Sequence, residues 1–501
     1  MANLWLRKPL SELLHQSETS ELKRTLGATN LVLIGIGAII GAGLFVRTAS
    51  AAAHHAGPSV AYAFILAAIG CAFAGLCYAE FASMIPVAGS AYTYSYATMG
   101  EFVAWLIGWN LILEYALGGA TLSIAWSEYL NKFIEYFIGK EWVVPFKWSH
   151  SPFQVLQDAS GAVLEQGIIN IPAIIILALV TWILIIGIQQ SASINAVIVA
   201  VKLAIVFLVI LFGWSFINPA NHDPYIPAPN THTALVNGVQ KIFEPITGGW
   251  WGIVRAAGVV FFAFIGFDAV STTAQEARNP KRDMPIGILG SLVVCTVLYV
   301  LFSHVLTGIA HYSEFQGASA EASVANAIQD HMPGYGWLAK FVTLAILFGF
   351  TSVMMVMLLG QSRVFYSMSI DGLVPKVFSV LHPVYKTPYR SNQLFFVFAA
   401  LFGGFIPGDI VGDMVSIGTL FAFVVVCIGI ILIRRSNPEI PRPFKTPFVP
   451  LFPILGAVAC LGMILGLGWL NWMRLIVWLI IGIVIYFAYS VKNSNVQKAN
   501  K

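Results

Sequence analysis

Long apolar stretches, separated by short polar segments, make up most of this chain. Many of these stretches reach the roughly 20 residues that a helix needs to cross a lipid bilayer. The pattern predicts an all-α membrane protein with twelve membrane-spanning helices, an even number that puts both ends of the chain on one side. The expected spans lie near residues 29–53, 59–83, 101–130, 168–190, 193–214, 250–275, 285–310, 338–368, 392–406, 409–433, 447–468 and 472–491.

Two of the predicted spans are interrupted by glycine at membrane depth. One break lies at residues 41–43 within 30–53, and the other lies at residues 265–267 within 250–274. A break inside the bilayer is tolerated only where it faces protein or a watery cavity. A broken helix presents N–H groups on one side of the break and carbonyl groups on the other. These groups suit the carboxylate and the amine of a zwitterion, so the pattern predicts a carrier of amino-acid-like solutes.

The position of the two breaks predicts an internal repeat. They fall in the first and sixth spans, so equivalent positions face opposite ways across the membrane, as in two inverted five-helix repeats. The identity between the two halves is too weak to add support. The expected organisation is a cytoplasmic N-terminal segment (1–28), repeat 1 (29–214), an external loop (215–249), repeat 2 (250–433), and two further spans with a cytoplasmic tail (434–501).

Composition agrees with this picture. The 501 residues are 58% hydrophobic and 10% charged, whereas a typical soluble domain has about 25% charged residues. The first 28 residues mix acidic and basic side chains without a continuous apolar core, so we do not expect a cleavable signal. The loops at about 131–167 and 215–249 are aromatic and contain proline, and we expect them to pack as short helices over the external mouth.

Basic residues are distributed unevenly between the two sides. Of the 27 Lys and Arg residues, three fall inside spans, eighteen fall in segments on the side of the termini, and six fall in segments on the other side, namely Lys132, Lys140, Lys147, Lys241, Lys340 and Arg474. This bias predicts cytoplasmic termini. It also accounts for the net charge of +4 without a nucleic-acid partner. The short tails favour a bacterial inner (cell) membrane, and the oligomeric state stays open.

Cysteine and histidine give no sign of a metal site. The five cysteines all fall in apolar spans and lack the paired spacing of metal ligands or of a disulfide framework. His54 and His55 form the only histidine cluster, and no third ligand stands near them. No cofactor-binding loop or catalytic constellation stands out either. We therefore expect neither an enzyme nor a bound cofactor.

Lys202 is the most informative single side chain. It lies in the middle of the fifth span, nine residues after the first residue of the span and twelve before the last. A lysine at the centre of a bilayer costs at least about 2.5–3.5 kcal/mol, so it usually has a partner and a role. Lysine also gains and loses a proton readily when buried. We expect Lys202 to couple transport to protons, and the alternative is a structural ammonium that ties span 5 to carbonyls of the broken span 1.

Other polar residues within the spans leave more than one interpretation open. Glu80, Glu114 and Asp268 could relay protons or bind a cationic side chain, and could equally make structural hydrogen bonds to neighbouring helix ends. Thr351 and Ser352 could line a site or bond back to their own helix.

Four motifs resemble a known family. GAIIGAGLF at 37–45, FFAFIGFD at 261–268, EARNPKRDMP at 276–285 and GQSR at 360–363 are similar to those of the amino acid–polyamine–organocation (APC) superfamily of transporters. The greatest likeness is to the bacterial homologues of cationic amino acid transporters. The resemblance implies the LeuT-like fold of inverted repeats with discontinuous helices 1 and 6. One departure is Gln275-Glu276, where many relatives carry two acids, which weakens any argument for a paired inner-gate carboxylate.

The resemblance also implies a substrate site. Backbone N–H groups of Ala42 and Gly43 would hold the carboxylate, and carbonyls of Ile39, Phe262 and Ile265 would hold the amine, with the Phe262 ring as the gate. Ser352 lies near a position that helps to decide whether a long cationic side chain fits, and a small residue there leaves room for one. The implied substrate-binding set is Ile39, Ile40, Gly41, Ala42, Gly43, Phe262, Ala263, Ile265 and Ser352.

The same resemblance gives Lys202 a place in the coupling machinery. In proton-coupled members, the matching lysine occupies the place that a sodium ion takes in sodium-coupled relatives. Its ammonium would face carbonyls near Gly37 and Ile40 and hydroxyls of Thr351 or Ser352. The expected proton-coupling residues are Lys202 together with the embedded acids Glu114 and Asp268, with the proton as coupling ion.

The expected function is proton-coupled symport of L-amino acids by alternating access, open to small neutral and to cationic substrates. One alternative is an exchanger of amino acids without net proton flow. The other is a sensor that binds an amino acid but does not carry it.

Overall fold

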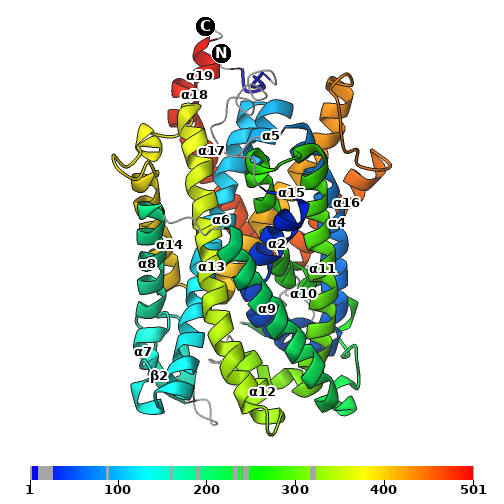
Figure 1. Cartoon of the computed structure of the whole chain (residues 1–501), viewed down its shortest axis with the longest axis vertical. Coiled ribbons are helices and arrows are strands. Elements are labelled where there is room, and N and C mark those ends of the chain that lie inside the picture. Colours follow the sequence, from blue (N-terminus) through cyan, green and yellow to red (C-terminus); the bar gives the residue numbers. More distant parts are fainter. Residues whose placement is uncertain are drawn as a thin grey trace.

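The computed structural model is built almost entirely of helices (Figure 1). It describes residues 3–9, 26–85, 90–157, 162–187, 192–229, 235–236, 239–240, 248–315 and 323–499. The α-helices are α2 (Ala28–Ile39), α3 (Thr48–Ala51), α4 (Val60–Met84), α5 (Ser90–Thr98), α6 (Glu101–Phe137), α7 (Phe146–Ser149), α8 (Ile171–Ile186), α9 (Ala192–Gly213), α10 (Gly249–Val260), α11 (Pro280–Ile309), α12 (Ser323–His331), α13 (Gly336–Ile370), α14 (Tyr389–Phe405), α15 (Gly408–Ser436), α16 (Leu451–Gly466), α17 (Trp469–Ile485), α18 (Val491–Asn493) and α19 (Asn495–Ala499).

Eight helical stretches among the described residues are long and apolar enough to cross a membrane. They are Gly43–Met84, Glu101–Phe137, Ala196–Phe216, Gly249–Ser271, Pro280–Ile309, Gly336–Ile370, Gly408–Ser436 and Trp469–Asn493. Shorter apolar helices are Ala28–Ile39, Ile171–Ile186 and Leu451–Gly466. A multi-pass membrane protein is thereby confirmed, while the count of twelve spans and the inverted repeat stay predictions.

Both expected breaks are present. α2 ends at Ile39, Ile40 has an extended conformation (φ −73°, ψ 100°), and a π-helical segment, η1 (Gly43–Arg47), begins the next helical run. α10 continues as a 3-10 turn, η7 (Phe261–Phe264), and a second 3-10 segment, η8 (Asp268–Glu276), follows residues 265–267.

The two breaks pack directly against each other. A Cβ at Gly43 would lie only 2.1 Å from Cα of Ala263, and a Cβ at Gly266 would lie 2.9 Å from the carbonyl oxygen of Ala38. Gly266 also has φ +109°, which L-residues other than glycine rarely adopt. These two glycines therefore allow the broken helices to cross with their backbones in contact.

The long loops differ in part from the expectation of short helices. The first contains α7 and an antiparallel hairpin of β1 (Val155–Gln157) and β2 (Val163–Gln166). The second contains short 3-10 turns and a hairpin of β3 (Leu235–Val236) and β4 (Val239–Gln240), and residues 230–234, 237–238 and 241–247 lie outside the described part. Strands of two to four residues are too short to leave a clear alternating pattern in the sequence.

The two ends of the chain lie at the same end of the molecule (Figure 1). The Gln497 side chain donates a hydrogen bond of 2.7 Å to the carbonyl of Asn3. We call this end, formed by residues 3–9 and 490–499, the terminal face. Most of the predicted N-terminal segment, residues 10–25, lies outside the described part.

Candidate functional site

The break in the first broken helix frees backbone carbonyls, and buried side chains bind them. In a continuous helix, the carbonyls of Gly37, Ile39 and Ile40 would accept bonds from N–H groups four residues further on. Here the ammonium of Lys202 on α9 donates to the carbonyls of Gly37 and Ile40, each at 3.0 Å. The hydroxyl of Tyr299 on α11 lies 2.9 Å from the carbonyl of Ile39. The break is therefore satisfied by two side chains from two other helices.

Lys202 is buried and tightly held. Only 3% of the residue is exposed, and a Cβ at Gly349 on α13 would lie 2.8 Å from Lys202 Cε. Its two carbonyl contacts are the ones that the resemblance implies. The resemblance also implies a hydroxyl of Thr351 or Ser352 facing the ammonium, but the Thr351 hydroxyl donates to the carbonyl of Leu347 in its own helix at 2.8 Å. Ser352 is buried on the same helix.

Tyr299 links the two breaks to each other. Its hydroxyl lies 2.9 Å from the carbonyl of Ala263 in η7, as well as 2.9 Å from that of Ile39. The residue is fully buried, and its ring packs against Phe64 and Phe264 with centroids 5.3 Å from each. Nothing in the sequence indicates this role of Tyr299, because a single tyrosine in an apolar span is common.

A small cavity lies where the two breaks meet, with about 20 Å³ of free volume, enough for about one water molecule. The breaks contribute Ala38, Ile39, Gly41, Ala42, Gly43, Phe262 and Ile265, and the helices α6, α13 and α15 contribute Gly118, Leu122, Val353, Met357 and Val415. Six of the nine predicted substrate-site residues are thus brought together. Ile40 and Ala263 instead give their carbonyls to Lys202 and Tyr299, and Ser352 lies outside this lining.

The lining determines what the cavity could hold. The residues from α6, α13 and α15 are all apolar, and no acidic side chain is found among the described residues that line it. An uncompensated positive charge there would lose its hydration without gaining a partner. In its present form the cavity is too small for an amino acid, so binding requires the lining to move apart. Met357 and Phe262 are the large side chains that would have to move.

Glu114 and Asp268 form a separate buried pair. Both are fully buried, on α6 and at the start of η8 respectively, and they lie close enough to interact electrostatically. Tyr115 donates to Oδ2 of Asp268 at 2.9 Å. Their predicted part in proton coupling stays a prediction.

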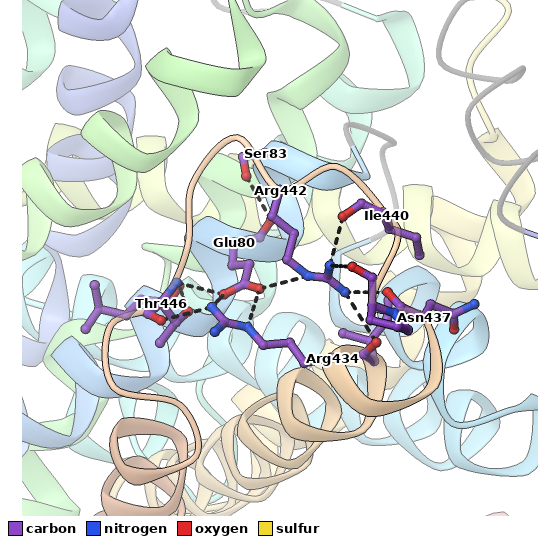
Figure 2. A network of polar contacts seen from close by, with 10 residues as sticks. Glu80, Ser83, Arg434, Asn437, Ile440, Arg442 and Thr446 are labelled. Atoms are coloured by element: carbon purple, nitrogen blue, oxygen red, sulfur yellow. Dashed lines mark hydrogen bonds and ion pairs between the residues drawn. The ribbon is translucent and has the colours of Figure 1, made fainter.

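Glu80 lies in an ion-pair network between α4 and the end of α15 (Figure 2). Arg434 donates to both of its carboxylate oxygens, at 2.9 and 2.6 Å, and the N–H of Thr446 donates at 2.7 Å. Nε of Arg442 lies 3.5 Å from Oε1 of Glu80, and its guanidinium also binds the carbonyls of Asn437 and Ile440. These contacts favour the structural interpretation of Glu80.

Arg47 joins the first broken helix to α15. It is 2% exposed, and its guanidinium pairs with Asp409 at 3.2 Å and with Asp413. Asp413 also accepts a bond of 3.0 Å from Asn471 on α17. Arg47 falls inside the first predicted span, and no pattern in the sequence indicates these partners.

The fold and this cavity define a class: a multi-pass membrane protein with a small closed site at the contact of two broken helices. The family model described as "Amino acid permease" matches residues 26–499. The branched-chain amino acid permease BcaP of Bacillus subtilis (strain 168) is 42% identical over 483 residues, covering 96% of each chain. The methylthioribose transporter of the same organism is 38% identical over 498 residues, covering 99% of this chain and all of the relative. Cationic amino acid transporter 4, vacuolar, of Arabidopsis thaliana is 32% identical over 429 residues, 84% of this chain and 64% of the relative.

The chain belongs to the amino acid permease family. It is therefore a transporter and not an enzyme, and the resemblance to the APC superfamily drawn from its motifs is confirmed.

Proposed function

We propose that the chain is a proton-coupled symporter of L-amino acids with neutral aliphatic side chains. The cavity that both broken helices line carries this proposal. It combines backbone N–H and carbonyl groups at the two breaks, which suit a zwitterion, with an apolar space for the side chain. The membership of the amino acid permease family supports amino acids as the substrate class.

The proposed pose follows from the polarity of the breaks. The N–H groups of Ala42 and Gly43 begin a helical run, where donors lack acceptors in their own helix and the dipole is positive. They would hold the carboxylate. The carbonyls of Ile39, Phe262 and Ile265 would hold the ammonium, with the ring of Phe262 closing the site.

The rest of the lining favours aliphatic over cationic side chains. Leu122, Val353, Met357 and Val415 offer dispersion contacts to a branched chain, and Gly118 leaves space beside them. A relative of 42% identity is named a branched-chain amino acid permease, which agrees with this preference. A lysine or arginine side chain would need an acceptor that the described lining does not provide.

Lys202 is the proposed coupling group. While protonated, it ties α9 to the carbonyls of Gly37 and Ile40 in the first broken helix. A neutral amine would hold these carbonyls less strongly, so α9 and α2 could separate and let the site open. Coupling requires that proton and substrate each favour one state of the carrier over the other, since a ligand with equal affinity for both states shifts nothing.

The remaining expectations fit this mechanism. The two broken helices would be the first and sixth of twelve spans in two inverted five-helix repeats, moving as a unit in alternating access. The terminal face would be cytoplasmic, in agreement with the excess of basic residues on that side, and the membrane would be the cell membrane.

Uptake into proteoliposomes tests the proposal. We expect an inward proton gradient to drive accumulation of labelled L-leucine, with L-isoleucine and L-valine competing well and L-lysine, L-arginine and methylthioribose competing poorly. Efficient competition by L-lysine would overturn the side-chain assignment. Uptake that occurs only with amino acid preloaded inside would identify an exchanger, and saturable binding without flux would identify a sensor.

Lys202→Ala tests the coupling role in the same assay. We expect it to abolish accumulation driven by the proton gradient while exchange of internal for external leucine continues. Lys340→Ala, at an exposed lysine, is the control and should transport like the wild type. Accumulation by Lys202→Ala that still follows the gradient would exclude Lys202 as the coupling group.

A further inference from the structure

We propose that Tyr299 is a positioning residue for the substrate amine, one that holds the amine-binding carbonyls of the two broken helices at a fixed spacing. The inference rests on the proposed function, because it concerns the same site. No motif singled out this residue, and it is outside the cavity lining.

The geometry places one hydroxyl between the two halves of the amine site. It lies 2.9 Å from the carbonyl of Ile39, which belongs to the end of α2, and 2.9 Å from that of Ala263 in η7. Ile39 is itself one of the proposed amine acceptors. Ala263 directly follows Phe262 and lies two residues before Ile265, the two other acceptors. A shift of either carbonyl relative to Tyr299 would thus shift an amine acceptor with it.

Two other direct contacts between the breaks set a minimum distance rather than a fixed one. Gly43 against Ala263 and Gly266 against Ala38 are close backbone approaches that stop the helices from moving nearer. They do not stop the helices from moving apart. The Tyr299 hydroxyl has one proton, which the two carbonyls share, and it opposes separation because a carbonyl that moved away would be buried without this donor.

Packing fixes the position of the Tyr299 ring and therefore the position of its hydroxyl. It is fully buried between Phe64 and Phe264, which themselves lie 6.3 Å apart between centroids. α11, which carries Tyr299, packs along α2 and α4. The Tyr299 hydroxyl is therefore held in place by the packing of α11 and of the two phenylalanine rings.

An ammonium group makes this spacing matter. It has three donors and no acceptor, and the three carbonyls proposed to accept from it belong to both broken helices, Ile39 to the first and Phe262 and Ile265 to the second. A carboxylate held by the N–H groups of Ala42 and Gly43 alone makes no such demand. Tyr299 is accordingly expected to affect recognition of the amine and to leave recognition of the carboxylate and side chain unchanged.

Tyr299→Phe tests this with two ligands that differ at one group. Inhibition of labelled L-leucine uptake is measured with unlabelled L-leucine and with L-2-hydroxy-4-methylpentanoate, which carries a hydroxyl in place of the amine. We expect KM and the inhibition constant for leucine to rise about tenfold, since a buried hydrogen-bond partner is lost, while the inhibition constant of the hydroxy acid stays within twofold. The maximal rate at saturating leucine should change less than KM.

Two further variants separate positioning from general damage. Tyr299→Met keeps an apolar side chain without a hydroxyl and should show the same selective loss. Trp105→Phe removes a buried bond of 2.8 Å from Trp105 to the carbonyl of Gly482 between α6 and α17, and it should leave the ratio of the two inhibition constants unchanged.

The inference is overturned if Tyr299→Phe weakens both ligands equally, which would mean a structural role only. It is also overturned if leucine binding is unchanged or tighter, which would mean that the hydroxyl competes with the amine. If the wild-type protein neither binds nor carries any amino acid, the proposed function falls and takes this inference with it.

Discussion

Gly43 and Gly266 are the residues at which this site depends on having no side chain. The first faces Cα of Ala263 and the second faces the carbonyl of Ala38 with a positive φ. Gly43→Ala and Gly266→Ala should each push the broken helices apart and reduce leucine uptake at least tenfold, because the nearby backbone atoms cannot move aside as a flexible side chain could. The measurement is uptake into proteoliposomes at equal protein content.

Gly462→Ala provides the matched control. Gly462 lies in α16, and a Cβ there would have no heavy atom within 4 Å other than those of its own helix and chain neighbours. Alanine is favoured over glycine in a helix by up to about 1 kcal/mol, so this variant should be at least as stable as the wild type and equally active. Loss of activity in all three variants would mean that helical glycines matter for a general reason and not for the contact of the breaks.

The sequence identifies residues whose burial in an apolar span is clearly unfavourable. It does not identify residues whose importance depends on partners far away along the chain. Lys202 stands out because a charge in an apolar span is expensive wherever its partner lies. Arg47 is equally buried, yet its partners Asp409 and Asp413 lie 362 and 366 residues further along the chain. The sequence indicates the role of Tyr299 even less, since its hydroxyl binds backbone carbonyls. The positions of these carbonyls depend on the fold and not on the type of side chain.

At the scale of elements, apolar runs and glycine breaks predicted most of the helices and both interruptions. The boundaries were less exact, as α11 shows. The expected span began at 285, but the helix starts at Pro280 after Asn279, whose N–H donates to Asp283 at 3.1 Å. A proline at the first helical position needs no partner for its missing N–H. Pro285, taken as the opening residue, lies inside the helix.

The network around Glu80 gives an element-scale prediction. Glu80→Leu would remove the fully buried carboxylate that faces the partly buried Arg434 and Arg442 and would leave their guanidinium groups without this anionic partner (Figure 2). Breaking a buried pair in this way costs about 3 kcal/mol or more, so the melting temperature of the detergent-purified protein should fall clearly. The same thermal assay on Glu439→Leu, at an exposed acid in the following loop, should give an unchanged midpoint.

The double variant Glu80→Leu/Arg434→Met refines that experiment. Removing both partners leaves no isolated charge in this pair, so the double variant should recover part of the stability lost in Glu80→Leu. If Glu80→Leu has the same melting temperature as the wild type, the network does not hold α4 to the end of α15.

At the scale of the whole molecule, the two ends of the chain meet at Glu101, because its N–H donates to the carbonyl of Leu6 at 2.9 Å and its carboxylate binds residues near the C-terminus. Glu101 at the start of α6 accepts bonds from Tyr96 at 2.9 Å, from Tyr486 at 3.0 Å and from Ser494. Lys8 pairs with Asp371 at the end of α13 at 2.8 Å. The terminal face is thus fastened to α6 and α13, the two longest helices, which pack along each other.

Glu101→Leu should weaken the attachment of the terminal face to α6. It would leave buried hydroxyls of Tyr96 and Tyr486 without their acceptor, at a cost of about 1–3 kcal/mol for each group left unsatisfied. We expect faster proteolysis of the C-terminal residues and a lower melting temperature, with leucine affinity unchanged because the substrate cavity is built from other residues. Glu141→Leu, at an exposed position, is the control, and equal protease resistance of the two variants would argue against the fastening.

The contact of Lys202 with the first broken helix has a consequence for how this protein tolerates mutation. Both acceptors are main-chain carbonyls, those of Gly37 and Ile40, and every amino acid supplies such a carbonyl. Substitutions at these two positions can disturb the path of the backbone but cannot delete the acceptor itself. The lysine, by contrast, has no substitute, because only its own side chain brings the ammonium. A point mutation can therefore remove a partner of this contact directly only at the codon for Lys202. The residues at positions 37 and 40 can vary without removing the acceptors, wherever the path of the backbone is preserved.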